Sequence, residues 1–168
     1  GVGNRVMTSP DGITWTSRTS ATDNWWTSVT YGAGLFVAVS STGSGDRVMR
    51  SSDGITWATS TSAANNAWNS VTYGNGRFVA VSVDGGASHV MTSTNGISWA
   101  TTTSAADNQW LSVTYGNGLF VATAQTGSGN RIMTSPNGLT WTIRTSPADN
   151  GWSSVTYGNG LFVSTSYD

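Results

Sequence analysis

The sequence predicts an all-β protein made of four copies of one four-stranded antiparallel unit. Methionine recurs at positions 7, 49, 91 and 133, so the unit is 42 residues long, and the 168 residues equal four such lengths. Thr, Val, Trp and Tyr are abundant, whereas the helix-favouring residues Lys and Glu are absent. We therefore expect a single domain over residues 1–168, with copies at about 3–44, 45–86, 87–128 and 129–168.

The copy between residues 68 and 102 shows the four expected strands most clearly, at 68–73, 77–82, 89–93 and 97–102. The first pair is separated by Asn75-Gly76 and the second pair by Asn95-Gly96. Asn-Gly tolerates positive φ at both positions and is a strong signal for a tight hairpin. Because a meander reverses at every turn, the short turns share one edge of the sheet and the longer, more variable loops share the other. Loops on a rigid scaffold often carry binding residues, which favours the long-loop edge for recognition.

The second strand of each unit is apolar on both faces, as in residues 35–39, 78–81 and 119–122. Such a strand must be covered on both sides, and a 42-residue unit is too small to do this alone. Stacking of identical units around a ring covers both faces. The sequence therefore predicts a β-propeller whose blades are four-stranded antiparallel sheets.

The chain begins within a third strand and ends just after a second strand. Joining Asp168 to Gly1 restores the loop pattern that residues 83–89 show within the chain. The strands expected at 5–9 and 13–19 can then share one blade with those at 152–157 and 161–166, which closes a four-bladed ring and removes its open sheet edges. The alternative is that the chain forms half of an eight-bladed dimer ring, so both a monomer and a homodimer are open.

The turn between the third and fourth strands carries a repeated motif, which reads Ser-Pro-Asp-Gly-Ile-Thr-Trp at residues 9–15. The motif occurs four times at constant spacing and resembles the Asp-box of the BNR-type propeller repeats found in sialidases and other secreted propellers. It departs from that family by a turn one residue shorter. The resemblance implies a structural role, in which the carboxylate or amide accepts hydrogen bonds from turn N–H groups and the Trp covers the hairpin. The positions concerned are Asp11, Trp15, Asp53, Trp57, Asn95, Trp99, Asn137 and Trp141.

Composition argues against several classes of function. Eight Asp and seven Arg are scattered along the chain for a net charge of −1, which favours neither a nucleic-acid partner nor an anionic membrane. No apolar run approaches the roughly 20 residues that a membrane helix needs, so membrane insertion is not expected. A surface rich in hydroxyls and amides and poor in charge favours an extracellular or cell-surface location.

The sequence also argues against an enzyme. The sialidase relatives require a catalytic Glu, and this chain has none. The repeated loop Asp becomes Asn65 in one copy, and His89 is the single histidine, which argues against a carboxylate pair, a catalytic triad, a metal site or any cofactor. We therefore expect a non-enzymatic recognition module.

Polar and aromatic residues recur on the long-loop edge. An Asn precedes each first strand, a Trp follows it two residues later, and an Arg or His opens each third strand. Such groups suit sugar binding, and repetition adds avidity. The alternatives are that the Asn side chains cap loops, that the Trp side chains fill the core, and that the chain is a structural or protein-binding repeat of a surface adhesin or phage-type fibre. Trp25 is the best contact candidate because its counterparts are Ala67, Gln109 and Gly151. The candidate ligand-binding residues are Asp23, Asn24, Trp25, Asn65, Asn66, Asp107, Asn108, Asp149, Asn150, Arg5, Arg47, His89 and Arg131.

Overall fold

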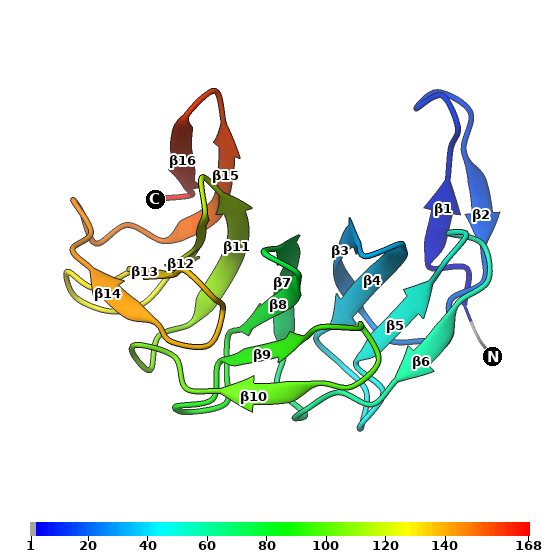
Figure 1. Ribbon diagram of the computed structural model, residues 1–168, viewed down its shortest axis with the longest axis horizontal. Helices are drawn as coiled ribbons and strands as arrows, with labels where there is room; N and C mark the ends of the chain where they lie inside the picture. Colours follow the sequence, from blue (N-terminus) through cyan, green and yellow to red (C-terminus); the bar gives the residue numbers. More distant parts are fainter. Residues whose placement is uncertain (1–2) are drawn as a thin grey trace.

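The computed structural model describes residues 3–168 as an open arc of antiparallel sheets (Figure 1). Within those residues every regular element is a strand, and none is a helix that could cross a membrane. The strands are β1 (Val6–Thr8), β2 (Thr16–Arg18), β3 (Trp26–Gly32), β4 (Leu35–Ser40), β5 (Val48–Ser51), β6 (Ala58–Ser60), β7 (Trp68–Gly74), β8 (Arg77–Ser82), β9 (Val90–Ser93), β10 (Ala100–Thr102), β11 (Trp110–Gly116), β12 (Leu119–Ala124), β13 (Ile132–Ser135), β14 (Thr142–Arg144), β15 (Trp152–Gly158) and β16 (Leu161–Ser166).

The strands form blades by sequential meander. β3–β6, β7–β10 and β11–β14 are each four-stranded antiparallel sheets, and β1–β2 and β15–β16 are two-stranded sheets at the two ends of the arc. The first strand of each blade lies toward the concave side and the fourth toward the outside (Figure 1). The predicted all-β architecture of four-stranded antiparallel units is confirmed.

The turn between the first and second strands is the tight hairpin that the sequence predicts. Asn75 and Gly76 have φ of 46° and 71°, and Asn117 and Asn159 adopt the same left-handed conformation in their copies. Two consecutive positive φ angles give the turn whose twist matches the flanking strands. Ala33 occupies this position in the remaining copy with φ 48°, although its Cβ is disfavoured there.

The turn between the third and fourth strands is wider than the sequence predicts. We expect strand from Ile97, but β10 begins at Ala100, and the corresponding strands in the other blades are equally short. The Asn95 Oδ1 accepts hydrogen bonds from the N–H groups of Ile97 and Ser98, both at 2.9 Å, and Trp99 Nε1 donates to the Gly96 carbonyl at 3.2 Å. These bonds hold the backbone in a closed turn through Trp99, so Ile97 cannot join the strand ladder.

The core lies between successive blades. In β8, Val79 and Val81 are fully buried, and they pack with Trp110, Phe120 and other side chains of the next blade. The equivalent cluster between the preceding pair of blades contains Val37, Val39, Trp68 and Phe78 among others. A second strand that is apolar on both faces is therefore buried on both faces, as the sequence predicts.

Two contacts recur at the three junctions between β3 and β15, where the first strand of one blade meets the first strand of the next. The Tyr73 ring lies over Gly32, where a Cβ would overlap it, and the same contact joins Tyr115 to Gly74 and Tyr157 to Gly116. Beside it, a serine Oγ in one blade accepts a hydrogen bond from a valine N–H in the next. These bonds are Val71 to Ser28 at 3.2 Å, Val113 to Ser70 at 3.1 Å and Val155 to Ser112 at 3.1 Å. Each junction is thus a copy of the others.

Closure of the ring within one chain is not shown. We expect β1–β2 and β15–β16 to share one blade, but they form separate sheets, and they lie at opposite ends of the arc (Figure 1). The expected connection through Gly1 and Val2 lies outside the described residues.

Candidate functional site

The long loops at one edge of the blades contain all the predicted ligand-binding residues. They connect the second strand to the third within a blade and the fourth strand to the first of the next blade. The structure shows that most polar groups in these loops bind one another. The candidate site is therefore a network of loop–loop contacts with a small number of free side chains.

The four loop Asn side chains donate to backbone carbonyls. Asn108 is buried, and its Nδ2 lies 2.9 Å from the Asn130 carbonyl oxygen. Asn24 and Asn66 are also buried and make the equivalent bonds at 3.1 and 2.8 Å, and Asn150 reaches the Asp168 carbonyl at 2.9 Å. This geometry fits the cap alternative, because the amide hydrogens point into the loop.

The acidic loop positions bind the neighbouring loop. Asp149 Oδ1 accepts a hydrogen bond from the Gly129 N–H at 2.7 Å, and Arg131 Nε lies 3.6 Å from the same oxygen. In the first copy, Asp23 pairs directly with Arg5. The hydrogen bond from Arg5 is the main cause that lowers the pKa of the Asp23 carboxyl below its ordinary value.

The copy with Asn65 keeps the loop contact without the ion pair. Asn65 Oδ1 accepts from the Gly45 N–H at 2.7 Å, as Asp149 does from Gly129. Arg47 Nε and Nη1 donate to the Gly43 and Ser41 carbonyls at 2.9 and 3.0 Å, and Arg131 makes the same two bonds to its own loop. An amide can therefore replace the carboxylate here, because the amide oxygen of Asn65 accepts the same backbone hydrogen bond as the carboxylate of Asp149.

His89 takes the place of arginine in the third copy. It is buried, with Nε2 2.6 Å from Asp107 Oδ1 and Nδ1 3.1 Å from the Ser82 carbonyl oxygen. Both ring nitrogens thus face oxygen atoms of the two adjoining loops. His89 links the same two loops that Arg131 and Asp149 link in the next copy.

The Trp residues that begin the first strands pack inward. Trp68 and Trp110 are fully buried, and each Nε1 donates to a carbonyl four residues earlier. Trp26 and Trp152 make the same bond and are more exposed at the ends of the arc. The structure therefore places this set in the core rather than on the loop face.

Trp25 projects from the loops with 66% of its surface exposed. Its backbone is fixed, because its N–H donates to Thr42 Oγ1 and its carbonyl accepts from the Ser41 N–H. Trp25 and Ser41 thus form a backbone-paired position at which the Trp25 side chain faces solvent. Ala67 with Val83 and Gln109 with Gln125 make the same backbone bond, and Gly151 with Tyr167 occupy the equivalent positions of the repeat.

Sequence reasoning missed Tyr167, which is 64% exposed on the same face. Its ring covers Gly151, where a Cβ would lie 2.8 Å from the Tyr167 Cζ. In one copy the aromatic Trp25 lies beside the small Ser41. In another copy the small Gly151 lies beside the aromatic Tyr167. The variation among Ser41, Val83, Gln125 and Tyr167 is a signal that could have identified the position.

The turns at the opposite edge use their acidic and amide residues for hydrogen bonds. Asp11 Oδ1 accepts from the Ile13 and Thr14 N–H groups, both at 2.8 Å, and these bonds lower the pKa of Asp11 to about 2. The equivalent bonds, from Thr56 first, lower the pKa of Asp53 well below its ordinary value. Asn95 and Asn137 accept the same pair of bonds without a charge.

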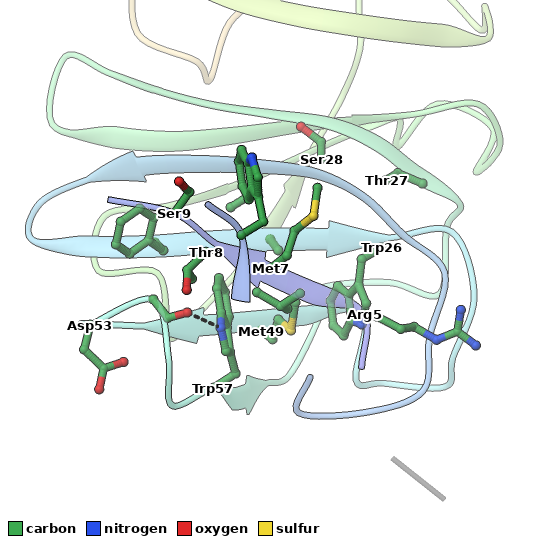
Figure 2. Close-up of a pocket in the computed structure, with 16 residues that line it drawn as sticks. Arg5, Met7, Thr8, Ser9, Trp26, Thr27, Ser28, Met49, Asp53 and Trp57 are labelled. Atoms are coloured by element: carbon green, nitrogen blue, oxygen red, sulfur yellow. Dashed lines mark hydrogen bonds between the residues drawn. The ribbon is translucent and has the colours of Figure 1, made fainter. Parts of the chain in front are cut away.

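An apolar groove of about 670 Å³ separates β1–β2 from the blade β3–β6. Met7 from β1 faces Trp26 and Met49 across it (Figure 2). Arg5 and Asp53 lie at its rim, with their charged groups directed away from its centre (Figure 2). The groove lies at an end of the arc, and Trp26, which lines it, directly follows the exposed Trp25 in the chain.

Several solved structures share this arrangement of strands. The computationally designed Ika4 protein matches with a TM-score of 0.62 at 10% identity over 86% of each chain. The designed Ika8 protein matches with a TM-score of 0.63 at 12% identity over 90% of this chain and 46% of its own. YCF48 from Cyanidioschyzon merolae matches with a TM-score of 0.60 at 20% identity over 93% of this chain and 54% of its own. A structure of YCF48 bound to a D1 peptide matches with a TM-score of 0.61 at 16% identity over 88% of this chain and 48% of its own.

The chain therefore spans about half the length of Ika8 and of YCF48. No family model and no curated protein matches the sequence. At these identities the likeness concerns the fold alone. Together with the sequential four-stranded meander, it shows that the chain has the β-propeller fold.

Proposed function

We propose that the chain is a non-enzymatic recognition module that binds glycans weakly through its long-loop face. The observation that carries the proposal is a pair of exposed aromatic side chains on this face: Trp25, whose backbone N–H donates to Thr42, and Tyr167, whose ring covers Gly151. An exposed indole or phenol ring on a rigid loop covers the C–H face of a sugar at little entropic cost.

The surroundings of these rings suit a neutral polar ligand. Thr42, Gln125 and Asp168 lie within hydrogen-bond contact of the residues that form the aromatic positions. The chain is 9% charged and has no Lys, so its surface offers hydroxyls and amides rather than an electrostatic patch. A ligand rich in hydroxyls fits this chemistry better than a strongly charged one.

The absence of catalysis is part of the proposal. Seven of the eight Asp residues accept a hydrogen bond from another group of the chain, and Asp107 contacts the His89 ring. Asp46 and Asp84, for example, accept from the N–H groups of Ser44 and Ala67. These carboxylates are engaged in holding turns and loops, and a general acid–base pair needs carboxylates directed at a substrate.

The proposal has two further parts. The turn motif supports a relation to Asp-box repeats, and the surface composition supports a location outside the cell. The hydrogen bonds that Asp11 and Asp53 accept support a relation to Asp-box repeats, in which this residue is structural. We place the module outside the cell or on its surface, in line with the secreted propellers that the motif resembles and the low charge content.

Protein binding is the second candidate. YCF48, a structural neighbour, has been solved with a bound D1 peptide. A peptide can use the same exposed rings, because aromatic side chains are common anchors in protein interfaces. In this case the module is a repeat domain of a larger adhesin or phage-type fibre.

A glycan array followed by calorimetry tests the first candidate. We expect dissociation constants between micromolar and millimolar for at least one neutral glycan class, and at least tenfold weaker binding by the double variant Trp25→Ala/Tyr167→Ala. Ile97→Ala, an exposed apolar residue of the opposite edge, is the matched control and leaves binding unchanged. No response on the array would contradict glycan binding. A peptide array that responds to the wild type and loses its signal in the double variant would favour the second candidate.

A further inference from the structure

We propose that two copies of this chain join end to end into one eight-bladed ring, in which β16 of each copy pairs with β1 of the other. Each chain supplies three complete blades and two half blades, which is four blade equivalents. Two chains then make eight, within the usual range for propellers. The inference does not depend on the ligand of the loop face.

The face of β3 is a blade surface that lacks its neighbour. Val29 is 60% exposed, whereas its counterparts Val71, Val113 and Val155 are 5%, 5% and 7% exposed. Tyr31 is 59% exposed, whereas the equivalent tyrosines lie over a glycine of the preceding blade. Val29 and Tyr31 therefore present the surface that is buried at each internal junction.

The face of β15 is the complementary half of that junction. A Cβ at Gly158 would meet no atom within 4 Å, although at Gly32, Gly74 and Gly116 the same position is covered by a tyrosine ring. The repeat assigns Tyr31 to the empty position over Gly158. It likewise assigns the Val29 N–H to Ser154 Oγ, as Val155 N–H is bound by Ser112 Oγ within the chain.

The apolar groove is lined by counterparts of the residues that pack against a second strand elsewhere in the chain, and no second strand of residues 3–168 fills it here. Trp26, Val29, Phe36, Met49 and Trp57 line it, and their counterparts two blades later form the core against β8. That core contains Trp110, Val113, Phe120, Met133 and Trp141, and the β8 residues Val79 and Val81 pack among them. The repeat places Val163 and Thr165 of β16 where Val79 and Val81 lie. A partner's β15–β16 hairpin thus completes this core.

The two ends also carry unpaired strand edges that match in register. β4 pairs with β5 so that Val37 lies opposite Arg50, and the same register sets Val163 opposite Thr8. The hydrogen bond from Ser40 N–H to the Arg47 carbonyl has its counterpart between Ser166 and Arg5. Open edges of this kind otherwise template aggregation.

The loop Asn of the last copy supports the same junction. Asn24, Asn66 and Asn108 each donate to a carbonyl 22 residues later. The corresponding acceptor for Asn150 is the Asn4 carbonyl, but Asn150 donates to Asp168 instead. Asn4 is exposed at the other end of the arc, where a second copy can bring it to Asn150.

The occupant is a second copy rather than the chain's own other end. The internal junctions repeat the same tyrosine–glycine and serine–valine contacts, and with those contacts the ends of the arc stand apart (Figure 1). In a closed ring of four blades, the rotation from one blade to the next is twice that in a ring of eight. Self-closure would therefore change every one of these contacts between blades. A second arc closes the ring while all steps keep one geometry.

Cysteine pairs test the register, because the chain has no cysteine of its own. In Thr8→Cys/Val163→Cys the two residues face each other across the proposed strand pair, so oxidation is expected to give a covalent dimer on a non-reducing gel. The control Met7→Cys/Val163→Cys is one residue out of register, which places the thiols on opposite faces, and stays monomeric on the gel. A disulfide within single Thr8→Cys/Val163→Cys chains, or no disulfide at all, would overturn the proposal.

Interface variants test the surface itself. We expect Tyr31→Asp and Gly158→Leu each to abolish the dimer at concentrations where the wild type is fully dimeric, while far-UV circular dichroism shows that the strands persist. Trp25→Ala, on the loop face, remains dimeric. Survival of the dimer in both interface variants would show that a different surface is responsible.

Discussion

The side chain of Asn108 binds the backbone carbonyl of Asn130 at 2.9 Å and thereby joins two loops that are 22 residues apart. Asn108 is 6% exposed, so its side-chain amide cannot exchange this bond for water at low cost. The same bond recurs in the other blades with Asn24 and Asn66. The long-loop face is thus rigid because its polar groups satisfy one another.

Removing this bond is expected to destabilise the fold. Asn108→Ala leaves the half-buried Asn130 carbonyl without its donor, which costs about 1 kcal/mol in the free energy of unfolding. Trp25 is exposed and directly follows Asn24, the counterpart of Asn108. Trp25→Ala therefore changes the free energy of unfolding by less than about 0.5 kcal/mol. Urea denaturation of both variants checks the prediction, and equal stability of the two would contradict it.

Ala33 is a site at which the protein can be stabilised. It has φ 48°, and three of the four copies place Asn there. Asn adopts the left-handed conformation more readily than Ala, so Ala33→Asn raises the free energy of unfolding by about 0.5–1 kcal/mol. Thermal unfolding measures the gain, and the reverse change Asn75→Ala serves as the control with the opposite sign. A lower melting temperature for Ala33→Asn would refute the strain at Ala33.

The turn carboxylates make stability depend on acid. The pKa of Asp11 is lowered from 3.8 to about 2, and that of Asp53 is lowered further. A folded-state pKa below the unfolded value gives stability that is complete above the unfolded pKa and is lost as pH falls through the folded one. The wild type therefore loses stability between about pH 4 and pH 2.

The double variant Asp11→Asn/Asp53→Asn isolates this effect, because Asn95 and Asn137 already make the same hydrogen bonds. Its melting temperature falls less between pH 4 and pH 2 than that of the wild type. Asn95→Asp/Asn137→Asp is the reciprocal control and falls more. Identical acid dependence in all three chains would show that these carboxylates are not linked to folding.

The serine–valine bond between blades predicts that equivalent serine substitutions in different blades have different effects on stability. Ser70→Ala removes the acceptor of the Val113 N–H, which is expected to cost about 1–3 kcal/mol. Ser154→Ala removes a group whose counterpart lies on the second copy, so its cost appears only where the dimer forms. Unfolding at high and low protein concentration separates the two variants, and a concentration-independent loss for Ser154→Ala would contradict this difference.

Much of the fold was predictable because each local sequence pattern occurs four times in the chain. Asn75-Gly76 and its counterparts specified the tight hairpins, and the apolar second strands specified stacked blades. The starts of the fourth strands were predicted too early. Side-chain bonds such as those accepted by Asn95 extend the turn, and a strand pattern does not reveal them.

The candidate site was predictable in location more than in role. The loop Asn and Asp residues lie on the expected face, but their partners are carbonyls and N–H groups that only the folded loops bring within reach, as with Asn66 and Ser88. Tyr167 was missed because Gly151 is the counterpart of Trp25 in that copy. The exposed aromatic side chain there comes from the neighbouring position, Tyr167, whose ring covers Gly151. Comparison of paired positions, rather than single ones, reveals it.

The solution mass by multi-angle light scattering is the most direct test of the proposed ring. The chain has a mass of 17.5 kDa. A ring of two copies, with Tyr31 seated over the partner's Gly158, predicts a single species of twice that mass at all concentrations above its dissociation constant. A species of one chain mass that persists at high concentration, or a continuous ladder of larger polymers, would contradict it.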